Sequence, residues 1–128
     1  MVNGGLSIKY LTPLENQRSK QVIIMPKIKI TVIKRTKPEE IFGEKGYTTP
    51  NGKKVTECTS FKDGQEFIVE GLNKPDGFCG WAWRDIYKDV SVLNFGGNFT
   101  NWAVDGTQYT CCTDGVRPVI YKLERIED

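Results

Sequence analysis

The stretch that decides the fold is Lys27-Ile28-Lys29-Ile30-Thr31-Val32-Ile33-Lys34, in which apolar and polar side chains alternate. Successive side chains of a strand point to opposite sides, so Ile28, Ile30 and Val32 would share one face. β-Branched residues in this alternation are typical of a strand with one buried face. We therefore predict a strand over 27–34 that lays one face of a sheet against a core.

Outward from this strand, the chain carries one strong helix pattern and several strand patterns. Over 81–94, apolar residues recur at steps of three and four, which places one apolar stripe along a helix. The stripe consists of Trp83, Ile86, Tyr87, Val90 and Leu93. The other expected elements are a short helix over 38–42 and strands over 65–70, 107–113 and 116–126. The pattern predicts a single α+β domain with a mostly antiparallel, curved sheet and one main helix near 81–94, with a small open barrel as the alternative.

The composition is that of an ordinary globular domain. The chain has 128 residues, of which 38% are hydrophobic and 27% charged, so one core can form. Lys and Arg total 18 and Asp and Glu total 16, and the formal net charge of +2 gives no reason to expect a nucleic acid or a membrane as partner. The chain contains no histidine, which excludes His-based catalytic triads and His metal ligands.

Residues 1–24 differ from the rest of the chain, because they lack a clear core-forming pattern. We expect a compact domain over 25–128 that follows an N-terminal extension. The alternative is that 7–11 or 21–25 adds an edge strand to the sheet. No apolar run approaches the roughly 20 residues of a membrane span, and the N-terminus lacks a secretory-signal pattern. We therefore expect a cytoplasmic location and reduced thiols.

The four cysteines are the residues best suited to nucleophilic reactions or to metal binding. Cys79 directly precedes the predicted main helix, and the N–H groups at a helix start favour a nucleophilic thiolate. Cys111 and Cys112 would point to opposite faces of a strand, so only one of them can join Cys58 and Cys79. Three convergent thiolates would suit a zinc or iron ion as cofactor and leave one coordination position open. The alternative is that the cysteines only fill the core.

Aromatic and charged residues around Cys79 suggest a pocket for a small molecule. The candidate ligand-binding residues are Trp81, Trp83, Arg84 and Trp102. Trp83 also fits as a core anchor of the helix, because it lies on the apolar stripe. With no histidine, proton transfer would fall to thiols or carboxylates, and the candidates beside Cys79 are Asp85 and Asp114. The simpler interpretations are that Asp85 faces solvent and that Asp114 shapes a turn.

Several motifs together resemble a family of small proteins of about 100 residues, mainly from anaerobic bacteria and archaea, which has no established activity. The motifs are Pro75-Asp76-Gly77-Phe78-Cys79, Trp81-Ala82-Trp83 with Asp85-Ile86, Gly96-Gly97-Asn98-Phe99, and Cys112-Thr113-Asp114-Gly115-Val116-Arg117-Pro118-Val119. The resemblance runs from about Lys27 to Glu127. It implies that Cys58, Cys79 and Cys112 are the important thiols and that the domain starts near Met25. Thr59 departs from the family pattern, which has proline after the first cysteine, so the local turn differs.

Three classes of function follow from these observations. The first is an enzyme that acts on a small molecule in a pocket lined by Cys and Trp, with Cys79 as the reactive thiol or with Cys58, Cys79 and Cys112 as metal ligands. The second is a binding module that uses the same pocket without chemistry. The third is a structural or interaction protein whose cysteines lie in the core.

Overall fold

The computed structural model describes residues 26–126, and the predicted N-terminal extension over 1–24 lies outside them. The elements are β1 (Lys27–Arg35), α2 (Pro38–Phe42), β2 (Glu66–Val69), α3 (Gly80–Asn94), β3 (Thr107–Cys111) and β4 (Val119–Ile126). The four strands form one sheet in the order β2-β1-β4-β3, and every neighbouring pair is antiparallel. The α+β class with one main helix is therefore confirmed. The sheet is open, so the barrel alternative is wrong.

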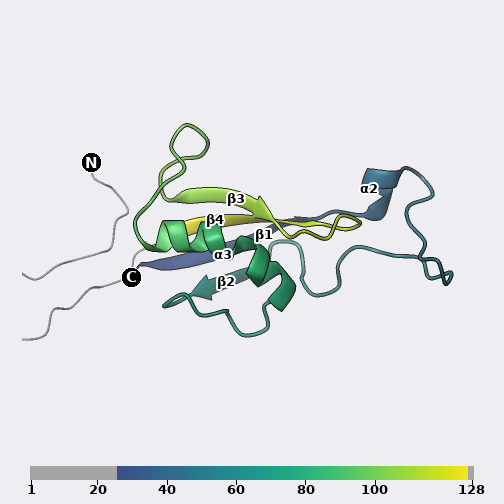
Figure 1. The fold of residues 1–128 in the computed structure, drawn as a ribbon, viewed down its shortest axis with the longest axis horizontal. Coiled ribbons are helices and arrows are strands. Elements are labelled where there is room, and N and C mark those ends of the chain that lie inside the picture. The colour runs from purple at the N-terminus through teal and green to yellow at the C-terminus, as the bar shows by residue number, and fades with distance from the viewer. Residues whose placement is uncertain (1–25, 127–128) are drawn as a thin grey trace, which may run out of the picture.

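The molecule has two layers, because α3 packs on one face of the sheet (Figure 1). The inner face of β1 consists of Ile28, Ile30 and Val32, none of which is exposed. Ile30 lies at the centre, paired with Phe67 of β2 on one side and Leu123 of β4 on the other. The alternation that predicted the first strand therefore also identifies the buried face of the sheet.

The apolar stripe of α3 completes the core, with one exception. Ile86, Val90 and Leu93 are fully buried against the sheet, as the three- and four-residue spacing predicts. Tyr87 is 40% exposed and instead packs against Trp83, with ring centroids 5.5 Å apart. The aromatic pair thus covers the edge of the helix–sheet interface.

Three predicted strands are shorter than expected: β2 by one residue at each end, β3 by two residues and β4 by three. Hydrogen bonds to two aspartates explain the larger differences in β3 and β4. The Oδ1 of Asp114 accepts the N–H groups of Val116 and Arg117, at 3.0 and 3.2 Å, so these groups do not join the sheet. Pro118 has no N–H to donate. β4 therefore starts at Val119 and not at residue 116. β3 ends at Cys111 because the N–H of Thr113 turns away to the carboxylate of Asp85.

The C-terminal end of α3 is closed by a buried arginine from β4. Arg125 is 8% exposed, and its Nη1 donates to the carbonyl oxygens of Leu93 and Gly97, at 3.0 and 2.8 Å. Its Nη2 donates to the Oδ1 of Asn98 at 2.8 Å, and the same oxygen accepts the N–H of Gly106. A cation here satisfies carbonyls that the end of a helix leaves unpaired. Arg125 therefore joins the helix end, the following loop and the sheet.

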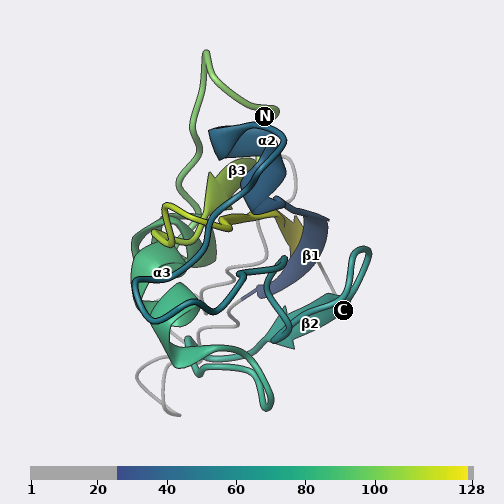
Figure 2. The same ribbon diagram turned by 90° about the vertical axis from the view of Figure 1, so that its right-hand side faces the viewer.

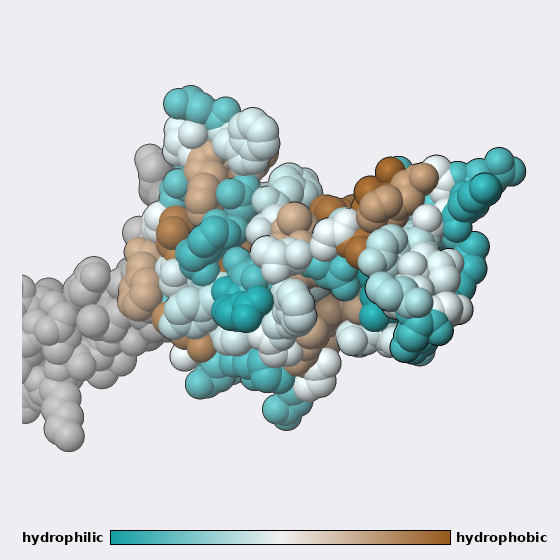
Figure 3. All heavy atoms as spheres, turned by 45° about the vertical axis from the view of Figure 1, so that its right-hand side comes forward, coloured by the Kyte–Doolittle hydropathy of each residue, from teal (hydrophilic) through white to brown (hydrophobic). Residues whose placement is uncertain are grey.

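The long connection between α2 and β2 positions the region described next. It extends beyond α2, then returns to the sheet beside the first half of α3 (Figures 1 and 2). The Nη1 of Arg35 in β1 donates to the carbonyl oxygen of Cys58 at 3.0 Å, and Asp63 accepts from the backbone N–H of Arg35 at 2.9 Å. Residues 58–63 are thus attached to the sheet. The outer part of the connection and α2 form an end of the molecule where hydrophobic residues lie beside a hydrophilic tip (Figure 3).

Candidate functional site

A pocket of about 240 Å³ lies at the N-terminal end of α3. Three separate parts of the chain build it: the connection before β2, the start of α3, and the segment from the end of β3 into β4. Its lining residues are Cys58, Ser60, Phe61, Cys79, Trp81, Ala82, Cys112, Asp114, Arg117, Val119 and Tyr121. Most of these side chains are apolar or sulfur-containing, and the polar ones are few, as is usual for small-molecule sites.

The pocket brings together three of the four cysteines. Cys58 and Cys79 are half-buried, whereas Cys112 is only 8% exposed. Cys111 is exposed and does not belong to the lining, because it points to the opposite face from Cys112. The structure therefore places on one pocket the three thiols that the sequence and the family resemblance single out.

Cys112 forms the most buried sulfur of the pocket. Its Sγ accepts the N–H of Val119 at 3.3 Å. Burial raises the pKa of the Cys112 thiol, and hydrogen bonds from the backbone of Val119 and Asp114 oppose this effect only in part. Cys112 is therefore a neutral thiol at neutral pH and a poor nucleophile.

Tyr121 contributes the least expected feature of the site. The residue is fully buried, and its hydroxyl has no hydrogen-bond partner within residues 26–126. Burial raises the pKa of Tyr121 strongly, and the nearby Cys112, Cys58 and Cys79 raise it further. The phenol is thus a neutral donor that lies near all three thiols. Buried hydroxyls are rarely left unpaired, so this one is the exceptional polar group of the site.

The sequence pattern indicates that Tyr121 is buried, but Tyr121 was not among the predicted site residues. Tyr121 alternates in phase with Val119 and Leu123, which places it on the buried face of the last strand. A tyrosine on such a face needs a partner for its hydroxyl. The lining residues that were not among the predicted site residues are Ser60, Phe61, Ala82, Arg117, Val119 and Tyr121.

Cys79 is the N-cap residue of α3, as expected from its place before the helix pattern. Its backbone is extended, with φ of −62° and ψ of 127°, and its side chain makes no capping hydrogen bond. The Cys79 carbonyl accepts the N–H of Trp83 at 2.9 Å, which begins the helical hydrogen bonds. The sulfur is therefore held at the helix start without being used to close it.

Asp85 and Trp81 share a hydrogen-bond chain through Thr113. The N–H and the Oγ1 of Thr113 donate to the Oδ2 of Asp85, at 2.8 and 2.9 Å. The Nε1 of Trp81 donates to the Oγ1 of Thr113 at 2.8 Å. Asp85 does not line the pocket, so the structure gives it the role of an anchor between α3 and the segment after β3. The interpretation that Asp85 faces solvent is wrong, because its side chain is only 8% exposed.

The charged groups that do line the pocket are Asp114 and Arg117. The Nε of Arg117 lies 3.6 Å from the Oδ2 of Asp114, and its Nη1 donates to the carbonyl of Thr56 at 3.3 Å. Asp114 also shapes the turn before β4, as described above. Its carboxylate therefore combines a structural role with a position at the pocket.

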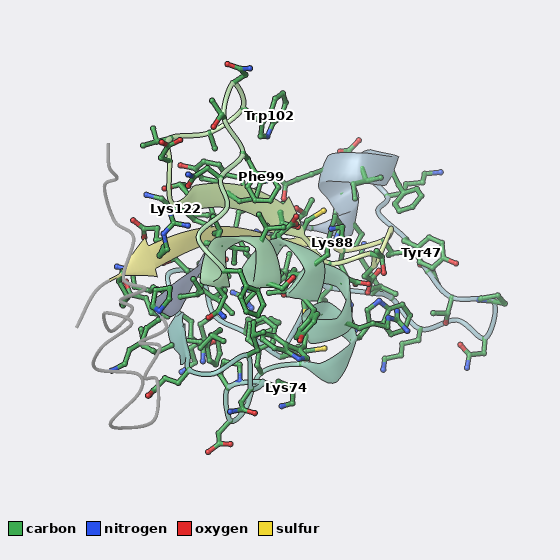
Figure 4. The ribbon with its side chains drawn as sticks, turned by 60° about the vertical axis from the view of Figure 1, so that its left-hand side comes forward. Tyr47, Lys74, Lys88, Phe99, Trp102 and Lys122 are labelled. Atoms are coloured by element: carbon green, nitrogen blue, oxygen red, sulfur yellow. The ribbon has the colours of Figure 1, made fainter. Side chains whose placement is uncertain are left out.

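Three predicted ligand-binding residues lie outside the pocket lining. Trp83 packs against the core, 6.2 Å from the ring of Phe78, which matches the alternative of a core anchor. Trp102 is 79% exposed at the tip of the loop between α3 and β3 (Figure 4). The guanidinium of Arg84 lies 5.3 Å from the ring of Trp81, so it reaches the pocket only through that ring.

The arrangement of the thiols does not fit a bound metal ion. Across the described residues 26–126, no group of three or more Cys, Asp or Glu side chains is arranged to hold one. Zinc or iron ligation needs at least three such groups at coordination distance. The reactive groups that the pocket itself presents are thiols and hydrogen-bond donors.

Comparisons with protein-family models, with curated proteins and with solved structures give no significant match for this chain. In the described part of the chain, no helix has both the length and the apolar character needed to cross a bilayer.

Proposed function

We propose that this protein binds a small electrophilic molecule in the pocket at the start of α3 and that Cys79 is the thiol that reacts with it. The observation that carries the proposal is the convergence of three thiols from distant segments around an unpaired, buried tyrosine hydroxyl. Packing alone would favour an apolar side chain in place of Tyr121, because an unpaired buried hydroxyl is unfavourable.

The size of the pocket restricts the ligand. Its volume of about 240 Å³ is below the roughly 300–1,000 Å³ typical of pockets for drug-sized molecules. A molecule of a few carbon atoms with one or two polar groups would fill it. Trp81 at 57% exposure and the buried Phe61 supply apolar walls for the carbon skeleton.

Cys79 is the best nucleophile among the three thiols. Cys112 is nearly buried and has a raised pKa, so it stays protonated. Cys58 is attached to the sheet through its carbonyl and has no helix start beside it. Cys79 is half-buried at the N-cap of a helix of 15 residues, where backbone N–H groups stabilise negative charge.

The neutral hydroxyl of Tyr121 lies behind the pocket wall, and it would become a hydrogen-bond donor for an oxygen of the ligand once the entering ligand displaces that wall. A carbonyl compound would use both groups: its carbon accepts the sulfur and its oxygen accepts the hydrogen bond. In this addition, the sulfur–carbon bond forms, the carbon–oxygen π bond breaks, and the thiol proton ends on the oxygen. The step needs no metal and no oxidant.

Alkylation of the native protein with iodoacetamide tests the proposal, with intact mass and peptide mapping as readouts. We expect Cys79 to react faster than Cys111, although Cys111 is the exposed cysteine. Reaction in urea gives the reference rate of each thiol in the unfolded chain. Cys111→Ser should keep the fast reaction, and Cys79→Ser should lose it.

The opposite order of reactivity would contradict the proposal. If Cys111 reacts first and Cys79 reacts more slowly than in urea, Cys79 is only a small core residue and the pocket is at most a non-covalent binding site.

A further inference from the structure

A second pocket adjoins the thiol pocket and has the opposite chemical character. Its volume is about 420 Å³, and its lining residues are Thr49, Lys53, Lys54, Val55, Thr56, Thr59 and Arg117. The lining contains three cationic side chains and three hydroxyls, and no carboxylate. We call it the basic pocket.

One strip of chain separates the two pockets. Thr56 and Thr59 line the basic pocket, whereas Cys58 and Ser60 line the thiol pocket. Arg117 lines both. A single molecule that extends past this strip would therefore touch the thiols with one end and Arg117 and the threonine hydroxyls with the other.

The charges of the basic pocket are only partly compensated by the protein. The Nζ of Lys54 lies 3.6 Å from the carboxylate of Glu39, and Arg117 pairs with Asp114. Within residues 26–126, Lys53 makes two backbone hydrogen bonds with Thr49: its N–H donates to the Oγ1 of Thr49 and its carbonyl accepts the N–H of Thr49. Its ammonium group has no partner there. One positive charge of the pocket is therefore available for an anion, together with the hydroxyl of Thr59. The hydroxyls of Thr49 and Thr56 already donate to Asn51 and to the carbonyl of Glu57.

We propose that the ligand of the thiol pocket carries an anionic group, a carboxylate or a phosphate, that binds in the basic pocket between Lys53 and Arg117. The inference rests on the proposed function and specifies its substrate class: a short carbonyl compound with a negatively charged end. The anion would stand near Arg117, which orients it, while the carbonyl carbon reaches Cys79.

Two thiol reagents of similar size test this inference on the Cys111→Ser protein. Dithiobis-nitrobenzoate carries carboxylates, and dithiodipyridine is neutral. With either reagent, the sulfur of Cys79 attacks one sulfur of the probe, a mixed disulfide forms, an aryl thiolate leaves, and the thiol proton goes to solvent. We expect Lys53→Ala to lower the rate at which Cys79 reacts with the anionic probe about threefold, which is the effect of one solvent-accessible ion pair. The rate with the neutral probe should stay the same.

Lys122→Ala is the matched control, because it removes the same charge from the outer face of β4 (Figure 4). It should change the ratio of the two rates by much less than Lys53→Ala does. Inorganic phosphate added as a competitor should slow the anionic probe at low salt if the pocket accepts phosphate. If only an added carboxylate, acetate, has this effect, the natural anion is a carboxylate.

The results separate the inference from the proposed function. If the neutral probe labels Cys79 rapidly but Lys53→Ala and both added anions leave the anionic rate unchanged, the basic pocket does not bind the ligand and the inference fails alone. If neither probe labels Cys79 in the folded protein, the proposed function fails, and the inference fails with it.

Discussion

The two ends of α3 meet the same strand, β4, in different ways. At the C-terminal end, Arg125 donates hydrogen bonds to Leu93, Gly97 and Asn98, so the helix is closed by the protein's own groups. At the N-terminal end, the buried hydroxyl of Tyr121 has no partner among residues 26–126, and Cys79 caps the helix without a side-chain hydrogen bond. Both β4 residues lie on the same face of the strand, four positions apart.

This difference separates an end of the helix that the protein's own groups close from the end where we propose that a ligand binds. Buried polar groups are normally paired, so the hydrogen bonds at the C-terminal end of α3 are explained by their contribution to the stability of the fold. An end that leaves a donor unpaired beside a pocket is better explained by a ligand. Asn94, at the closed end, also has a buried oxygen without a partner in the described structure, but it lines neither of the two pockets.

The largest effect should come from the closed end. Arg125→Met keeps the unbranched apolar stem of the side chain but removes the guanidinium donors to the carbonyls of Leu93 and Gly97 and to Asn98, so the Leu93 carbonyl keeps the N–H of Gly96 but loses its charged donor. We expect a loss of about 3 kcal/mol in the free energy of unfolding, because several buried hydrogen bonds to a charged group are lost together. Urea denaturation measures it. The same measurement on Lys122→Ala, on the exposed face of β4, should show a change within about 0.5 kcal/mol.

A smaller loss should follow from Asp85, which links α3 to the segment after β3. Asp85→Ala removes the acceptor of two hydrogen bonds from Thr113, and we expect a loss of about 2 kcal/mol in urea denaturation. Asp76→Ala, in the exposed loop before α3, is the control and should change stability by no more than about 0.5 kcal/mol. Equal stability of the two variants would mean that the Thr113 contact is not formed in solution.

The sequence predicted the elements of the fold better than their arrangement. The alternation around Ile30 and the stripe through Ile86 are local patterns, so they identified both a strand and a helix with their buried faces. The order of the strands depends on contacts between distant residues, which periodicity does not contain. The ends of β3 and β4 differed from the prediction because Asp114 and Asp85 accept backbone N–H groups that the strands would otherwise use.

In the candidate site, too, local patterns predicted individual residues, whereas contacts between distant residues decided which of them lie together. The convergence of Cys58, Cys79 and Cys112 was implied by the family resemblance and by the opposite faces of neighbouring strand residues, not by any local pattern. Trp102 was misplaced because a tryptophan in a loop has no periodicity that fixes where it points. Arg117 was missed because its position depends on how the turn before β4 folds.

Tyr121→Phe tests the N-terminal end of α3, beside the pocket, and should have little effect on stability. The variant removes a buried hydroxyl that has no partner, so we expect the free energy of unfolding to stay the same or to rise by up to about 1 kcal/mol. A loss of more than about 1 kcal/mol in urea denaturation would show that the hydroxyl is paired within the protein. The contrast with Arg125→Met would then disappear.

The smallest expected effect is that of Cys112→Ala on the pH dependence of stability at alkaline pH. Burial raises the pKa of Cys112 in the folded state above the ordinary value of about 9, so folding favours the protonated thiol. This contribution to stability is complete below pH 9 and is lost as the pH rises through the folded pKa. Cys112→Ala should therefore show a shallower decrease in unfolding temperature between neutral and alkaline pH than the unchanged protein, and an equal slope would contradict the burial of the thiol.

The most direct test of the whole account is to bridge the pocket thiols with a short bifunctional alkylating reagent such as dibromobimane, followed by peptide mapping. The account predicts rapid bridges between members of the set Cys58, Cys79 and Cys112, retained in Cys111→Ser and absent in urea. Single alkylation of each cysteine without any bridge, or bridges that require Cys111, would show that the three thiols do not share one pocket.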